Sequence, residues 1–308
     1  MLAFLQENLI PEVPLEDWTN SASEYITDTF EGFFDIVQDG LGGIVDVSVA
    51  VLLFPPELVM VGILSLIAYF IAGWRVAVFS VLGFLLIISL RLWEVSMESL
   101  ALVLASTVVA LAIGIPLGIL VAQSRSLEAF TTPSLDVMQT LPAFVYLVPL
   151  IVLLGLGGGP ALVATVIFAM PPAVRLTMLG IRGVPRNTVE AAHAFGATPW
   201  QTLRKVELPQ ALPTIMAGVN QVIMLALSMV VIAGLVGAGG LGGEVVRGLG
   251  RLDVGQAFAA GLGIVIIAIY LDRVSRNLST VARRTEKKGA FSKVLRREKK
   301  QEPEKAAA

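Results

Sequence analysis

The sequence is 308 residues long, with 56% hydrophobic and 15% charged residues, and its mean hydropathy is +0.81. A soluble domain usually carries about a quarter charged residues, so this much apolar surface exceeds what a single globular core can bury. The chain has no cysteine and one histidine, His193, which excludes disulfides, thiolate metal sites and a metal centre built from histidines. Composition therefore predicts a protein whose main solvent is lipid.

Charge is unevenly distributed along the chain, although the net charge is only −2. The first 74 residues contain Asp and Glu but no Lys or Arg, whereas Asp272–Ala308 is rich in Lys and Arg. We therefore expect an acidic N-terminal arm (1–57), a transmembrane body (58–271) and a basic tail (272–308). The excess of basic residues in cytoplasmic segments of membrane proteins explains the tail better than nucleic-acid binding does. Membrane lipid, and no nucleic acid, is the expected partner of this tail.

The N-terminal arm has the pattern of an amphipathic helix. Apolar residues recur at helical spacing between Tyr25 and Val45, with Asp and Glu between them. Ser21 and Glu24 have the spacing of a capping box, which predicts the start of the helix. We expect this helix to lie along the membrane surface or against the spans.

Long uncharged stretches follow the arm, and crossing the hydrocarbon of a bilayer takes roughly 20 apolar residues. We expect about seven spans, and the first two are short runs separated by Arg75, which a single long tilted helix over Leu58–Leu90 would also fit. The other five form the expected core: Leu100–Val121, two spans within Val137–Val174 that turn at Gly155–Pro160, Gln210–Gly243 and Val254–Leu271. The predicted fold class is an all-α polytopic membrane protein.

Basic residues predict which loops lie inside the cell. Arg182, Arg186, Arg204 and Lys205 fall in one loop (182–213), and the basic tail follows the last span, so both are expected on the cytoplasmic side. The C-terminus is then cytoplasmic. Seven spans place the acidic arm outside, whereas a single helix over Leu58–Leu90 places it inside.

The loop 182–213 contains signals for two short helices. Asn187 with Glu190 has the spacing of a capping pair for a helix through about Phe195, and Gly196 suits the following position, where a positive φ is needed.

The second helix is predicted to start at Thr198, with Pro199 and Gln201 completing the signal, and to run to about Glu207. Leu208–Pro209 is then expected to turn the chain towards the next span.

The same loop resembles the EAA loop of ABC-importer permeases. The resemblance is carried by Glu190-Ala191-Ala192, by Gly196 after three residues, and by Val206-Glu207-Leu208-Pro209 after nine more; the family usually has Ile in place of Val206. It implies a type I ABC importer fold and a loop of coupling helices that sits in a groove of the ATPase subunit. The docking motif that it carries over is Glu190, Ala191, Ala192, Gly196, Leu208 and Pro209. A purely structural interpretation, in which Glu190 caps and Gly196 ends a helix, is compatible with docking.

A narrower resemblance extends over the spans. Leu135–Leu150, Pro213–Ala233 and Gly239–Gly255 are similar to the glycine betaine/proline betaine branch of these permeases. The resemblance implies a permease subunit in the bacterial cytoplasmic membrane that imports quaternary-ammonium osmoprotectants. It also implies a permease homodimer, two ATPase subunits and an external substrate-binding protein.

The chain lacks the residues of a catalyst. It has no G-x-x-x-x-G-K-[ST] loop to hold ATP phosphates, and Gly237–Gly250 is interpreted as a flexible turn after a span. We therefore expect no catalytic residue, metal or cofactor in this chain, with ATP and Mg²⁺ on the partner ATPase. An aromatic cage for a quaternary ammonium is expected on the binding protein.

Polar residues inside spans are costly in lipid and therefore tend to face a bundle interior or a pore. The candidates for the translocation path are Gln139, Thr140, Asn220, Gln221 and Ser228, with Met224 and Met229 as adaptable neighbours.

Two alternatives remain open at this level. One is an ABC permease for another small amine or an amino acid, which the loop cannot distinguish. The other is an ion-coupled secondary transporter, which requires ionisable residues at membrane depth. Glu98 and Arg175 are the main internal charges, and both lie at the ends of predicted spans, which disfavours this class.

Overall fold

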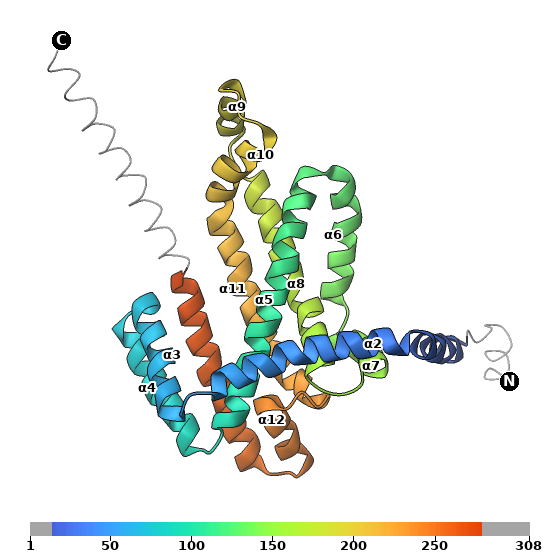
Figure 1. The fold of residues 1–308 in the computed structure, drawn as a ribbon, viewed down its shortest axis with the longest axis vertical. Helices are drawn as coiled ribbons and strands as arrows, with labels where there is room; N and C mark the ends of the chain where they lie inside the picture. Colours follow the sequence, from blue (N-terminus) through green and yellow to red (C-terminus); the bar gives the residue numbers. More distant parts are fainter. Residues whose placement is uncertain (1–13, 279–308) are drawn as a thin grey trace, which may run out of the picture.

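The computed structural model describes residues 14–278, and every regular element within that range is helical. Figure 1 shows an elongated bundle with two short helices at one end, the α9 end, and another at the opposite end, the α12 end. The helices are α2 (Leu15–Leu53), α3 (Glu57–Ala72), α4 (Trp74–Ser89), α5 (Trp93–Gln123), α6 (Arg125–Thr140), α7 (Ala143–Leu154), α8 (Gly158–Arg182), α9 (Arg186–Ala194), α10 (Pro199–Thr202), the π-helix η1 (Leu203–Glu207), α11 (Leu208–Leu235), α12 (Gly240–Gly250) and a final helix over Val254–Leu278.

Helices α5, α8 and α11 form the centre of the bundle and contact one another (Figure 1). Glycines allow the backbones to approach closely. A Cβ atom at Gly118 of α5 would lie 2.7 Å from Thr177 of α8, and one at Gly218 of α11 would lie 3.2 Å from Leu176 of α8. In a bilayer, moving an apolar side chain from lipid into a helix contact gains no hydrophobic free energy. Helix association there depends instead on the close packing that small residues allow.

The number of spans differs from the expectation. Within residues 14–278, the helices long and apolar enough to cross a membrane are Asp17–Leu53, Trp93–Gln123, Gly158–Arg182, Pro199–Leu235 and Val254–Leu278. Helices α6 and α7 add a sixth span if they are counted as one bent span. The all-α polytopic fold is confirmed, whereas the count of seven is not.

The segment Leu58–Leu90 forms two helices, not one long helix. Each has 16 residues, and the chain turns between them at Gly73, whose φ of 92° favours glycine. They pack against each other beside the final helix (Figure 1). A short hairpin thus replaces the single tilted helix that the sequence also allowed.

Helix α2 starts earlier than predicted. It begins at Leu15 with Pro14 before it, so the capping box at Ser21 and Glu24 is wrong: those residues lie inside the helix. The helix runs across the bundle and packs against α5, α7 and α8, where Val45 is buried (Figure 1).

The predicted span that begins near Val137 is broken. Helix α6 ends at Thr140, and α7 continues at a bend of 94° after Leu141 and Pro142. The residue before a proline is pushed out of the helical region, and Leu141 accordingly has extended φ and ψ. The predicted turn at Gly155–Pro160 is present, because α8 begins at Gly158.

The expectation of a flexible turn over Gly237–Gly250 is wrong, because α12 starts at Gly240. Two side chains from the start of α5 cap this helix: the Glu98 carboxylate accepts the Gly240 N–H at 2.7 Å, and the Ser99 hydroxyl accepts the Leu241 N–H at 2.8 Å. The carboxylate also complements the positive end of the helix dipole. Glycines on both helices place α12 directly against the backbone of α11.

Gly242 tests this close packing. A Cβ atom at Gly242 would lie 2.0 Å from the backbone oxygen of Val230, so Gly242→Ala must move α12 away from α11. We expect a loss of about 1–3 kcal/mol in stability, measured as a lower thermal unfolding midpoint of the purified protein in detergent. Gly250→Ala, at the other end of α12 with nothing within 4 Å, is the control and should shift the midpoint little. Equal midpoints for the two variants would contradict the packing argument.

Candidate functional site

The segment between α8 and α11 projects beyond the rest of the bundle at the α9 end (Figure 1). Helix α9 has nine residues, and none of them is buried. Its main contacts are with α10 and η1. An isolated helix of nine residues is at best marginally stable in water. A helix with this much exposed surface is therefore typical of an element that packs against a partner.

The predicted helix caps are partly right. No side chain caps α9, which begins after Pro185, so the capping pair Asn187–Glu190 is wrong. Gly196 has a φ of 79°, as expected at the end of a helix. Thr198 and Gln201 form the predicted capping box, with hydrogen bonds of 3.3 and 3.0 Å between each side chain and the other residue's backbone N–H.

The predicted turn at Leu208–Pro209 is wrong. Helix α10 passes through the π-helix η1 into α11 without a break, giving one helical segment over Pro199–Leu235. A π-helical turn changes the backbone hydrogen-bond spacing just before Pro209, which has no N–H to donate. The exposed tip is therefore continuous with a central helix of the bundle.

Arg182 fastens the base of this segment to α5 and α6. Its guanidinium donates to the backbone oxygens of Val121 and Ala122 at 3.0 and 3.1 Å, and it pairs with Glu128 at 2.6 Å. Cations near a helix C-terminus satisfy free carbonyl groups and complement the dipole.

A small apolar cluster supports the segment beside Arg182. Its buried members are Ile181, Leu203, Ala211 and Ile215. The ends of α8, η1 and α11 are therefore packed against one another.

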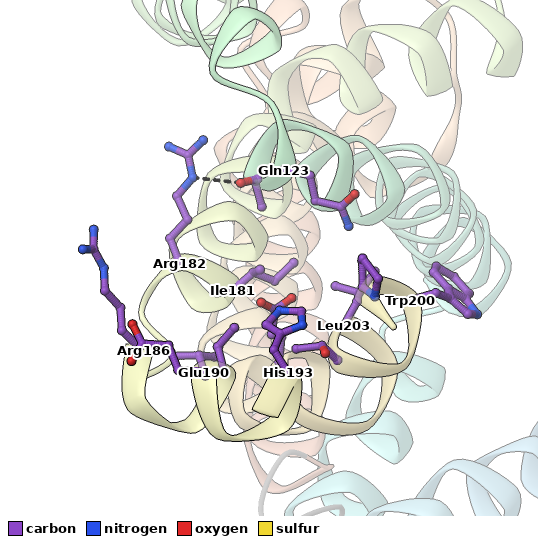
Figure 2. A pocket seen from close by; sticks show the side chains of 14 residues that line it. Gln123, Ile181, Arg182, Arg186, Glu190, His193, Trp200 and Leu203 are labelled. Carbon is purple, nitrogen blue, oxygen red and sulfur yellow. Dashed lines mark hydrogen bonds between the residues drawn. The ribbon is translucent and has the colours of Figure 1, made fainter. Parts of the chain in front are cut away.

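A cavity of about 660 Å³ lies between α9 and the ends of α5 and α8. Figure 2 shows Gln123 and Arg182 on one side of it and Glu190, His193 and Leu203 on the other. The Nδ1 atom of His193 donates to the Ala197 carbonyl oxygen at 3.3 Å, which ties the end of α9 to the start of α10.

Glu207 also lines this cavity, and the uncharged stretch of α11 begins directly after it.

Two aromatic side chains at the tip, which the sequence alone did not single out, are exposed. Phe195 is 93% exposed and Trp200 is 65% exposed, and Figure 2 shows Trp200 turned outward beside the cavity. Exposed large apolar groups at the tip of a polar loop mark an interaction surface. The exposure of Phe195 and Trp200 is visible only in the structure, because an aromatic residue at the end of a helix can equally well be buried.

The residues of the EAA-like motif lie in two zones. Glu190, Ala191 and Gly196 are exposed on the tip, and Ala192 is partly buried. Leu208 and Pro209 are partly buried at the base, where Leu208 packs on the apolar cluster.

The translocation-path candidates fall into separate groups. Gln221, Met224 and Ser228 are exposed along one face of α11, and Asn220 beside them has a buried Oδ1 atom without a hydrogen-bond partner. Met229 is completely buried in the core, so the structure does not bring it to that face. Gln139 and Thr140 are exposed at the end of α6.

An ion pair between Asp136 of α6 and Arg175 of α8 was also missed. The expectation that Arg175 lies at the end of a span is wrong, since it is seven residues before the end of α8. Asp136 was outside the span predicted to begin at Val137, and the structure places it within α6.

Comparison with known proteins identifies the family. The family model for binding-protein-dependent transport system inner membrane components matches residues 114–283. The chain belongs to this family. It is therefore a multi-pass membrane permease subunit with the type I ABC importer fold.

Two curated relatives are similar over most of this permease. The glycine betaine transport system permease protein OpuAB of Bacillus subtilis is 47% identical over 87% of this chain and 95% of its own length. The glycine betaine/carnitine transport permease protein GbuB of Listeria monocytogenes is 48% identical over 89% of this chain and 98% of its own.

A solved structure shares the fold. An inward-facing MetNI methionine ABC transporter matches with a TM-score of 0.57 and 25% identity over 62% of this permease and 95% of that chain.

Gly196 tests the geometry of the tip. Its positive φ costs an L-residue about 1–2 kcal/mol, so Gly196→Ala should increase opening of the α9 backbone about 5- to 30-fold, while Gly196→Asn should have a smaller effect. Hydrogen–deuterium exchange of the α9 amides measures the opening. Since nothing lies within 4 Å of an added Cβ, unchanged exchange in Gly196→Ala would refute the conformational requirement.

Proposed function

We propose that this permease carries glycine betaine/proline betaine-type osmoprotectants into the cell by alternating access, driven by two copies of a separate ATPase subunit. In this proposal ATP and Mg²⁺ bind to the ATPase, an external binding protein delivers the cargo, and two permease copies form the path. The protein lies in the bacterial cytoplasmic membrane with its α9 end and C-terminus on the cytoplasmic side.

The observation that carries the proposal is the projecting tip formed by α9 and α10. It has an unpartnered helix, exposed aromatic groups and a continuous helical connection to the centre of the bundle. A force applied to α10 would therefore reach α11 without passing through a turn, and α9 packs on α10 and η1. The EAA-like residues Glu190, Ala191 and Gly196 lie on the same tip, where an ATPase subunit would meet them.

The cargo is inferred from the two similar permeases. Their names specify glycine betaine, and one also specifies carnitine. Both compounds are zwitterions with a quaternary ammonium and a carboxylate. This similarity favours a betaine over an unrelated amine or amino acid, and family membership disfavours an ion-coupled secondary transporter.

Purification from the native membrane in mild detergent tests the assembly. We expect a P-loop ATPase to accompany this chain in equal amount, and proteoliposomes with the complex and its binding protein to take up labelled glycine betaine when ATP is supplied. A chain that purifies alone, from osmotically stressed and unstressed cells alike, would overturn the importer assignment. Uptake of another solute in place of betaines would overturn only the cargo.

Phe195 tests the docking surface. Full burial of its side chain in an interface is worth about 1.5–3 kcal/mol, so Phe195→Ala should weaken ATPase binding roughly 10- to 100-fold without unfolding the permease. Phe54→Ala is the matched control, because Phe54 is 90% exposed but far from the tip in sequence, in the connection between α2 and α3. Titration of the ATPase onto the purified permease measures the affinity. Equal affinities for the two variants would exclude Phe195 from the interface.

Glu190 tests transmission of force. It makes no helix cap, so Glu190→Ala should leave α9 folded while lowering the amount of betaine imported per ATP hydrolysed. Uptake and hydrolysis are measured in the same proteoliposomes. An unchanged ratio would remove Glu190 from the coupling pathway.

A further inference from the structure

Two ion pairs connect α6 and α8. Glu128 and Arg182 pair near the α9 end at 2.6 Å, and Asp136 and Arg175 pair further along both helices, with Nη2 of Arg175 donating to Oδ1 of Asp136. The two pairs are separated by eight residues of α6 and seven of α8. At 1.5 Å per residue the second pair lies about 10–12 Å further from the α9 end.

The depth of the second pair sets its environment. Arg175 lies seven residues inside the candidate span Gly158–Arg182, about 10 Å from its end, which corresponds to a third of a hydrocarbon layer about 30 Å thick. A charged side chain exposed to lipid at depth is unfavourable by several kcal/mol, so such residues face water-filled paths or other protein. In the single chain, 31% of the Arg175 side chain and 57% of the Asp136 side chain are nevertheless exposed. An exposed ion pair at that depth fits a surface that faces a path or a second protein better than one that faces lipid.

The Arg175 guanidinium has hydrogen-bonding capacity left over. Its Nε atom is buried and has no hydrogen-bond partner, although a guanidinium carries five N–H donors suited to a carboxylate. Burying an unpaired donor is costly, so the arrangement favours an additional acceptor at this place.

Uncharged polar groups extend the site along α6. Gln139 and Thr140 follow Asp136 by three and four residues and therefore share its face of the helix. Both are exposed, and the bend between α6 and α7 follows directly. The ion pair and the two neutral polar groups thus lie near the end of α6, where the chain bends into α7.

We propose that Asp136 and Arg175 form a transit site where a zwitterionic cargo separates the ion pair and binds across it. The cargo carboxylate takes the place of Asp136 on the guanidinium, and its quaternary ammonium lies beside the freed Asp136 carboxylate. No uncompensated charge is left, which is the condition for breaking an ion pair in a low-dielectric region. Because the pair re-forms on release, binding is weak and the cargo moves on. This inference rests on the proposed function, which supplies the zwitterion.

Cysteine labelling tests access and occupancy, since the native chain has no cysteine. We expect a thiosulfonate reagent with a trimethylammonium group to label Gln139→Cys in the complete complex, and millimolar glycine betaine to slow that labelling about 5-fold or more. Met138→Cys, two residues from Asp136 and on the opposite face of α6, is the control and should show no protection. Gln139→Cys that never reacts, or protection that is equal at both positions, would overturn the site.

Transport assays of substituted proteins distinguish a cargo site from a strut, meaning an ion pair that only holds α6 and α8 together. Asp136→Asn and Arg175→Gln should lower betaine uptake per ATP at least about 10-fold, while ATP hydrolysis remains stimulated by the loaded binding protein. Glu128→Gln removes the other α6–α8 ion pair but leaves the bonds of Arg182 to α5, and it should retain normal uptake.

The outcomes distinguish the two proposals. Equal losses in Glu128→Gln and Asp136→Asn would make the inner pair a strut, and so would parallel losses of uptake and hydrolysis. Normal uptake in Asp136→Asn and Arg175→Gln would likewise overturn the transit site. Absence of betaine uptake by the unsubstituted complex would instead contradict the proposed function itself.

Discussion

The structure depends on the close approach of α8 to the two helices that flank it. Gly114 and Gly118 of α5 and Gly218 of α11 present backbone to α8, and Gly180 of α8 presents its own backbone to α11. In lipid, contacts of this kind replace the hydrophobic effect as the source of stability, because apolar burial alone gains little. A packed core of this sort resists gradual deformation, so a displacement at one end of α8 or α11 is passed along the helix.

Much of the fold was predictable from residues whose effect is local. Such local signals have the predicted outcome at the uncharged stretches Leu100–Val121 and Val254–Leu271, at Gly196 and at the capping box of Thr198. The capping pairs expected at Ser21 with Glu24 and at Asn187 with Glu190 fail locally. Two other errors arise where distant residues decide. Gly237–Gly250 has the composition of a loop, yet Glu98 and Ser99, far away in sequence, cap it and make it a helix. Likewise Pro209 signals a turn, but the packing of Leu203 and Ala211 with Ile181 of α8 keeps the helix continuous.

The candidate sites also include features that local spacing predicts and features that depend on residues far apart in the sequence. The EAA-like motif was recognised by its resemblance to a family pattern, because the whole pattern lies within about twenty consecutive residues. Asp136 and Arg175 are 39 residues apart, and no local spacing connects them. The sequence also predicts a span from Val137, whereas α6 begins at Arg125, so Asp136 falls outside the predicted span although it lies within the helix. Exposure of Phe195 is likewise a property of the assembled tip and not of the sequence around it.

Helix α8 joins the two sites physically. Arg182 and Arg175 are seven residues apart, about two helical turns, so both point to α6 from the same face. Arg182 belongs to the packed base of the tip, and Arg175 to the inner ion pair. A movement of the tip that shifts α8 along α6 therefore acts on the inner pair, which is the pair that a zwitterion can replace, while the bonds of Arg182 to α5 hold the base of the tip. In the proposed mechanism, coupling of this kind needs no separate relay. One helix carries both Arg182, at the base of the α9–α10 tip, and Arg175, at the proposed transit site.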